Sequence, residues 1–168
     1  MTELVIRPAI RDDIPSICEV NLSSKTRSEI AGFTAPEFAT FSSPDVLAKV
    51  WARRNRLKDG FEVIVAEKDG RVVGFIVFKK ERGYVDIDNV DIRKDEQGKG
   101  VGRALVTHVE NIAITSGHSL MKTDTTENAQ GVPWKSYVFW TRMGYRDTGE
   151  RLRTKYGFKT IPFVKSLK

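Results

Sequence analysis

The chain has 168 residues, of which 40% are hydrophobic and 30% charged, and its 28 Lys and Arg against 22 Asp and Glu give a formal net charge of +6. This composition is ordinary for a globular protein, and the single cysteine, Cys18, excludes a disulfide scaffold. No run approaches the roughly 18 apolar residues of a membrane span, and residues 1–6 lack the basic start of a secretion signal. We therefore expect a cytoplasmic protein that folds as a single domain over residues 1–168.

The excess of positive charge is compatible with an anionic partner. The Lys and Arg residues are spread along the chain rather than gathered in a run, which is typical of a solvated surface. Because no recognised nucleic-acid-binding motif accompanies them, nucleic acid is not an expected partner.

The first third of the chain predicts a strand followed by two helices. Residues 4–7 alternate as a strand, and a pair of Asp residues can cap a helix whose apolar stripe includes Cys18. On such a stripe Cys18 is expected to be a buried side chain rather than a nucleophile. Residues 23–43 predict loop and short helix, and residues 45–57 predict a second helix with basic residues near its C-terminal end.

Three antiparallel strands are predicted next. Residues 61–67 and 71–80 are apolar runs separated by Lys-Asp-Gly, and an Asp-Gly pair between such runs is a strong hairpin signal. A further turn leads into a third strand over residues 85–92. All three strands precede a glycine-rich segment.

The third strand contains a slip in its apolar pattern. Val85 and Ile87 lie on one parity, whereas Val90 and Ile92 lie on the other, so the period of two shifts by one residue near Asn89. A β-bulge is the simplest cause of such a slip, and it leaves a backbone N–H without a ladder partner. We therefore expect a bulge in the middle of this strand.

A glycine-rich turn, Gln-Gly-Lys-Gly-Val-Gly-Arg over residues 97–103, opens the next helix. That helix is predicted over residues 100–116 and ends at Gly117. Free N–H groups at a helix start favour a phosphate group. A glycine turn that only caps the helix is the alternative interpretation.

Two other phosphate-binding motifs fit this turn less well. A Rossmann motif would place Arg103 where a Gly or Ala must let helix and strand pack closely, and three Asp residues in the preceding strand are unusual for a buried parallel strand. A P-loop needs Gly-Lys-Ser/Thr, but Lys99 is followed by Gly100.

The last third predicts a strand over residues 119–125, a helix over residues 133–143 and two more strands, the last over residues 160–167. The complete predicted order is β, α, α, β, β, β, α, β, α, β, β.

Gln97, Gly100 and Gly102 stand in the pattern Gln-x-x-Gly-x-Gly, which resembles the acetyl-CoA-binding motif of the GCN5-related N-acetyltransferase (GNAT) superfamily. The predicted order of elements is similar to the whole fold of that family. The resemblance implies an α/β protein with the acyl-CoA N-acyltransferase fold: a mixed, mostly antiparallel sheet of about seven strands, flanked by about four helices.

Acetyl-CoA is the acyl donor that the resemblance implies, without a metal, and its phosphates match the positive charge of the chain. It implies cofactor contacts from the following residues: Val90, Asp91, Ile92, Gln97, Gly98, Lys99, Gly100, Val101, Gly102, Arg103, Asn128 and Trp140. A main-chain amide at or near Val90 would polarise the thioester oxygen.

Asp86 and Asp88 are the candidates for handling the acceptor amine, because they stand where relatives carry a Glu or His base. An ordinary Asp has a pKa of about 3.9, so it needs burial, a neighbouring carboxylate or a water chain to act as a base. The alternative is that these carboxylates bind the substrate ammonium or pair with Arg and Lys.

Many relatives protonate the leaving thiolate with a Tyr four residues before a Gly-Phe pair. Here the pair is Gly144-Tyr145 and the position is Trp140, whose indole does not release its proton at neutral pH. Tyr137, one helical turn earlier, is the substitute candidate. Alternatively, Tyr137 and Trp140 pack along the pantetheine channel and the thiolate leaves unaided.

The resemblance therefore implies an N-acetyltransferase that moves an acetyl group to a primary amine, on a small molecule, a polyamine or a protein, by direct attack in a ternary complex. An acyl-CoA-binding sensor or interaction module without turnover is the alternative function. The expected partners are acetyl-CoA and an amine, with no membrane, and a homodimer is compatible with the family.

Overall fold

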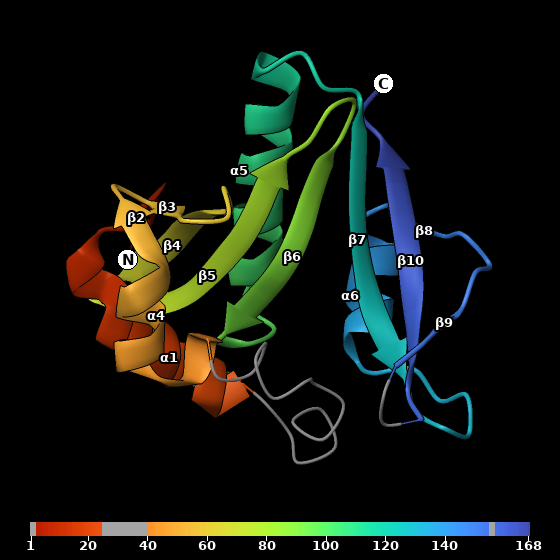
Figure 1. Ribbon diagram of the computed structural model, residues 1–168, viewed down its shortest axis with the longest axis horizontal. Coiled ribbons are helices and arrows are strands. Elements are labelled where there is room, and N and C mark those ends of the chain that lie inside the picture. The colour runs from red at the N-terminus through yellow and green to blue at the C-terminus, as the bar shows by residue number, and fades with distance from the viewer. Residues whose placement is uncertain (1–2, 25–39, 155–156) are drawn as a thin grey trace.

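The computed structural model describes residues 3–24, 40–154 and 157–168 (Figure 1). Its elements, in chain order, are β1 (Leu4–Pro8), η1 (Arg11–Asp13), α1 (Ile14–Ser24), α4 (Pro44–Val50), β2 (Trp51–Arg53), β3 (Arg56–Leu57), β4 (Glu62–Lys68), β5 (Arg71–Lys80), β6 (Val85–Ile92), η2 (Lys94–Glu96), α5 (Val101–Thr115), β7 (Leu120–Glu127), α6 (Ser136–Arg142), β8 (Arg146–Asp147), β9 (Leu152–Arg153) and β10 (Lys159–Ser166).

The strands form one mixed sheet in the order β2-β3-β4-β5-β6-β7-β10-β8, with β1 paired to β4 and β9 paired to β10. Every pairing between named strands is antiparallel except β6 with β7. The expected α/β fold with a mostly antiparallel sheet is confirmed. The expected count of about seven strands is too low, because the sheet has ten strands within the described part of the chain. Four of them, β2, β3, β8 and β9, are only two or three residues long.

Two apolar clusters lie on the two faces of the sheet. One contains side chains of α5 and α6, including Leu105 and Trp140, and the other contains side chains of α1 and α4, including Ile17 and Leu47. Figure 1 shows α5 and α6 behind the sheet and α1 and α4 at its other face. Among the described residues, no helix is both long enough and apolar enough to cross a bilayer.

The predicted helix over residues 45–57 is wrong beyond its first half. Helix α4 ends at Val50, and the chain then makes a short hairpin of β2 and β3. Trp51 and Leu57 are both buried in the α1–α4 cluster, and the Trp51 indole donates to the Arg54 carbonyl at 2.7 Å. A continuous helix would not bring these two side chains into the same cluster, so tertiary packing overrides the local helical pattern.

Several local predictions are confirmed. The β4–β5 hairpin turns at Asp69 and Gly70, both with positive φ (53° and 74°) as a two-residue type I′ turn requires. Helix α5 is followed by Gly117 at φ 83°, as expected for its C-terminal cap. Most of the segment 23–43, expected to be loop and short helix, lies outside the described residues.

Candidate active site

Strands β6 and β7 separate along their length. They pair in parallel only at their first residues, Val85 with Met121 and Asp86 with Lys122. Beyond this point the two strands spread apart (Figure 1). A cavity of about 530 Å³ lies between their C-terminal halves, and the first turn of α5 and five of the seven residues of α6 complete its wall. This volume is within the range of small-molecule sites, about 300–1,000 Å³.

A β-bulge interrupts β6 at the side of this cavity. Ile87 pairs with Phe78 of β5 and Asn89 pairs with Val77, so two consecutive residues of β5 face three residues of β6. Asp88 is the extra residue. The slip predicted from the sequence is therefore confirmed, one residue before Asn89.

The bulge keeps the apolar residues of β6 on one face of the sheet. Val85 and Ile87 belong to the cluster under α5, and Val90 and Ile92 pack against the same cluster although their sequence parity is opposite. A bulge also frees backbone groups from the ladder. Because Asp88, Asn89 and Val90 line the cavity, an amide freed there has access to a ligand.

The glycine-rich turn has the backbone geometry that its glycines predict. Gly98 and Gly100 adopt φ of 77° and 88°, in the left-handed region where a Cβ is unfavourable, and α5 begins directly after them at Val101. Gly102 serves another purpose: a Cβ there would lie 3.2 Å from the Phe139 ring of α6. The first turn of α5 thus faces the cavity with its N–H groups and contacts α6 closely.

Gln97 connects the two walls of the cavity. Its side-chain amide donates to the Ile92 carbonyl at 3.1 Å, and its Oε1 accepts from Lys135 Nζ at 2.9 Å. Lys135, Arg103 and Arg142 all line the cavity. These three cations favour an anionic ligand beside them. The lining also contains four carboxylates, those of Asp88, Asp91, Glu96 and Asp124.

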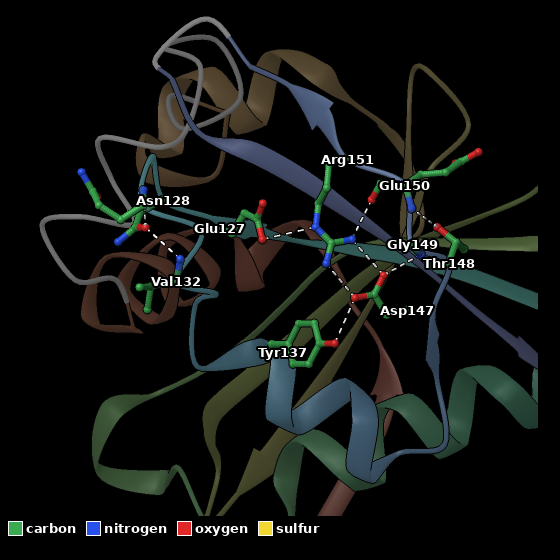
Figure 2. A network of polar contacts seen from close by, with 10 residues as sticks. Glu127, Asn128, Val132, Tyr137, Asp147, Thr148, Gly149, Glu150 and Arg151 are labelled. Atoms are coloured by element: carbon green, nitrogen blue, oxygen red, sulfur yellow. Dashed lines mark hydrogen bonds and ion pairs between the residues drawn. The ribbon is translucent and has the colours of Figure 1, made fainter.

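Ten of the twelve cofactor residues expected from the sequence line this cavity, namely Val90, Asp91, Ile92, Gln97, Gly98, Gly100, Val101, Gly102, Arg103 and Trp140. Lys99 is exposed beside the cavity, with its Nζ 3.8 Å from Glu96 Oε1. Asn128 accepts two backbone hydrogen bonds within its own turn, from Gln130 at 3.0 Å and Val132 at 2.9 Å. The geometry thus gives Asn128 a role in its turn (Figure 2).

The two candidate carboxylates lie in different surroundings. Asp88 is exposed and lines the cavity, whereas Asp86 is half-buried outside it, with Lys79 and Lys122 as its strand partners. Burial raises the pKa of the Asp86 carboxyl, and nearby Glu81 raises it further, while the two lysines act in the opposite direction. Of these two candidates, Asp88 is therefore the one that a substrate in the cavity can reach.

The Tyr137 hydroxyl lies outside the cavity wall. It donates to Asp147 Oδ2 at 2.9 Å, and this hydrogen bond raises the pKa of the phenol. Arg151 binds the same carboxylate and also donates to Glu127 Oε2 at 3.2 Å. Figure 2 shows Tyr137 turned toward this cluster, so the structure does not bring Tyr137 together with Asp88 and Trp140.

The chain that forms this site matches a known protein family over most of its length. The family model for an acetyltransferase (GNAT) domain matches residues 22–167, most of the chain. The chain belongs to the GNAT acetyltransferase family. It is 34% identical over 94 residues to a protein of Methanocaldococcus jannaschii described as an uncharacterized N-acetyltransferase; this match covers 55% of the chain and 56% of the relative, so it spans about half of that relative's length.

Solved structures of N-acetyltransferases share the fold over nearly the whole chain. PaiA N-acetyltransferase of Thermoplasma acidophilum, in complex with coenzyme A, superposes with a TM-score of 0.70 at 15% identity and covers 95% of this chain and 98% of its own. An aminoglycoside 6'-N-acetyltransferase, also complexed with coenzyme A, gives a TM-score of 0.71 at 13% identity. The match covers 98% of this chain and 97% of that enzyme. At these identities the likeness concerns the fold.

The GNAT cavity also contains hydroxyl groups that sequence analysis missed. Thr123 and Thr125 of β7 and Ser136 of α6 line it, and the Thr125 and Ser136 hydroxyls are hydrogen-bonded to each other. Thr123 donates to the Ile87 carbonyl at 3.0 Å, across the two strands where they begin to separate. The alternating Thr residues of the β7 pattern were the available signal, but only the fold shows which wall they face.

Proposed function

We propose that this GNAT protein transfers an acetyl group from acetyl-CoA to a primary amine by direct attack in a ternary complex. The observation that carries the proposal is the cavity between β6 and β7, which has a bulge on one strand and a glycine-rich helix start at its end. When bound, acetyl-CoA supplies the thioester from which the acetyl group is transferred.

The residues of the cavity fit such a donor. The N–H groups of the glycine-rich turn, at the positive end of the 15-residue helix α5, hold the diphosphate, and Arg103, Lys135 and Arg142 add positive charge around it. The separated edges of β6 and β7 offer backbone groups to the amides of the pantetheine arm. An amide freed at the bulge, at or near Val90, donates to the thioester oxygen.

We assign to Asp88 the role of binding the amine and taking part in its deprotonation. Its exposed carboxylate lies at the bulge, beside the amide proposed to hold the thioester oxygen. The amine nitrogen forms a bond to the acetyl carbon, the carbon–sulfur bond breaks, and the nitrogen gives its proton to water or to Asp88. Because an ordinary Asp is a weak base, we propose that a water molecule connects Asp88 to the amine.

Direct transfer is favoured over a covalent acyl-enzyme. Cys18 is the single thiol of the chain. It is buried in the α1–α4 cluster, does not line the cavity, and burial raises the pKa of its thiol to about 11. A thiol that is inaccessible and protonated at neutral pH is a poor nucleophile.

The test is the release of coenzyme A from acetyl-CoA in the presence of a panel of amines: polyamines, aminoglycosides, small amines and peptides with free N-termini or lysines. Release that depends on one class of amine supports the proposal and identifies the acceptor. Tight binding of acetyl-CoA without release with any of these amines would instead favour a sensor of acyl-CoA.

A further inference from the structure

We propose that the hydrogen-bonded pair of hydroxyls on Ser136 and Thr125 donates a hydrogen bond to the sulfur of coenzyme A and stabilises it as the leaving thiolate. This inference rests on the proposed function, because it needs the cosubstrate to lie between β6 and β7. It assigns a hydrogen-bond donor for the leaving sulfur in a chain that has Trp140 at the usual Tyr position and whose Tyr137 hydroxyl is bound to Asp147.

Neither of those two aromatic side chains is a suitable proton source. Trp140 lines the cavity, and its indole N–H donates hydrogen bonds but does not give up its proton at neutral pH, so it is the hydrogen-bond donor that competes with Ser136. The Tyr137 hydroxyl is already bound to Asp147, and that carboxylate is held by Arg151. Using the Tyr137 proton would require breaking this cluster (Figure 2).

Among the described residues that line the cavity, five carry a hydroxyl: Ser24, Thr123, Thr125, Thr126 and Ser136. Ser24 donates to Asp91 Oδ1 at 2.7 Å, and Thr123 donates to the Ile87 carbonyl. Their protons are therefore occupied. Thr126 has the opposite parity to Thr123 and Thr125 along β7, so its side chain points to the other face of the sheet. Thr125 and Ser136 instead bind each other, from β7 and from the first position of α6.

A pair of hydroxyls differs from a hydroxyl bound to a carbonyl or a carboxylate. Each hydroxyl has one proton and accepts through two lone pairs, so when one hydroxyl donates to the other, the second keeps its own proton for a third group. Ser136 lies one helical turn before Trp140 on α6 and is only partly buried, so it presents this proton to the cavity. The Thr125 hydroxyl holds it in place.

The chemistry asked of the pair is a hydrogen bond and not a proton transfer. An ordinary thiol has a pKa of about 8.5, so a thiolate is an acceptable leaving group near neutral pH once a donor stabilises its charge. Hydrogen bonds to charged acceptors are about twice as strong as those between neutral groups. A donor at Ser136 should therefore lower the pKa of the thiol of bound coenzyme A and favour departure of the sulfur.

The test measures the pKa of the thiol of bound coenzyme A by the ultraviolet absorbance of its thiolate, with desulfo-coenzyme A as the blank. Ser136→Ala should raise that pKa by about one, equivalent to a tenfold loss of thiolate at a given pH. Thr125→Val should raise it less. Thr141→Val is the matched control, because Thr141 is an exposed hydroxyl of the same helix that donates to the Tyr137 carbonyl, outside the cavity.

An unchanged thiol pKa in Ser136→Ala, with coenzyme A still bound by calorimetry, would overturn this inference and leave the proposed function standing. A shift in Trp140→Phe without one in Ser136→Ala would also overturn it, in favour of the indole as donor. Absence of coenzyme A binding to the wild-type protein would instead contradict the proposed function. If Ser136→Ala does not fold, Thr125→Val carries the same test.

Discussion

Arg151 binds Asp147 through two parallel hydrogen bonds, from Nη1 to Oδ1 at 2.9 Å and from Nη2 to Oδ2 at 2.8 Å. This bidentate contact is the main reason that the pKa of the Asp147 carboxyl falls to about 2. The same carboxylate accepts from the Gly149 amide and from Tyr137, so it joins the segment after β8 to helix α6. The cluster supports the helix that forms one wall of the cavity.

The first prediction concerns the stability of this cluster at low pH. The pKa of Asp147 is lower in the folded protein than its unfolded value of about 3.9, so its contribution to stability is present above about pH 4 and is lost as the pH falls toward 2. Asp147→Asn should lower the unfolding temperature by a few degrees at pH 7, corresponding to about 1 kcal/mol for a partly exposed ion pair, and by much less at pH 2.

Thermal unfolding of the wild type and of Asp147→Asn between pH 7 and pH 2 checks this difference in unfolding temperature. The other pairs with a lowered carboxyl pKa, Arg7 with Asp13 and Arg93 with Glu19, are present in the wild type and in the variant and cancel in the difference. An equal difference in unfolding temperature at pH 7 and pH 2 would show that the Asp147 charge is not what stabilises the fold.

The second prediction concerns Tyr137. Because its hydroxyl is bound to Asp147 and lies outside the cavity wall, Tyr137→Phe should keep kcat for acetyl transfer within about threefold, while the loss of a hydrogen bond to a charged group, about 1.5–3 kcal/mol at most, lowers the unfolding temperature. Coenzyme A release and thermal unfolding are the two measurements. A hundredfold loss of kcat with intact affinity for coenzyme A would restore Tyr137 as the acid.

The third prediction tests the diphosphate site. Gly100→Asp should abolish binding of coenzyme A in calorimetry, because a carboxylate at the helix start repels the diphosphate. Gly117→Asp is its matched control: both glycines have similar positive φ, 88° and 83°, and a Cβ added at either would meet no other atom within 4 Å, so the backbone strain is comparable. Loss of binding in both variants would mean that strain, rather than the site, explains the effect.

The fourth prediction separates the two carboxylates. Asp88→Asn should lower kcat about 100-fold, a typical effect for a group that handles a proton in the reaction, with little change in affinity for coenzyme A. Asp86→Asn should lower kcat less, because Asp86 lies outside the cavity between two lysines. Steady-state kinetics with the acceptor found in the amine panel measures both. Wild-type rates in both variants would remove these carboxylates from the mechanism.

Patterns carried by adjacent residues predicted a large part of this protein correctly. The Asp69-Gly70 turn, the left-handed glycines before α5 and the slip that marks the bulge in β6 all depend on the backbone preferences of neighbouring residues. The same kind of reasoning failed at residues 51–57, because two apolar side chains were drawn into a cluster with distant parts of the chain. Local propensity is weak compared with such burial.

The sequence by itself thus determined the family, the order of most elements and the backbone geometry of the glycine-rich turn before α5, since each is encoded in contiguous residues. Only the tertiary structure decided which candidate side chains share the cavity. In the structure the Tyr137 hydroxyl binds Asp147, and the Thr125 and Ser136 hydroxyls bind each other. Asp88 lines the cavity, whereas Asp86 lies outside it. The physical reason is that a hydrogen bond depends on the position and direction of two side chains from different elements, and no local pattern in the chain encodes that geometry.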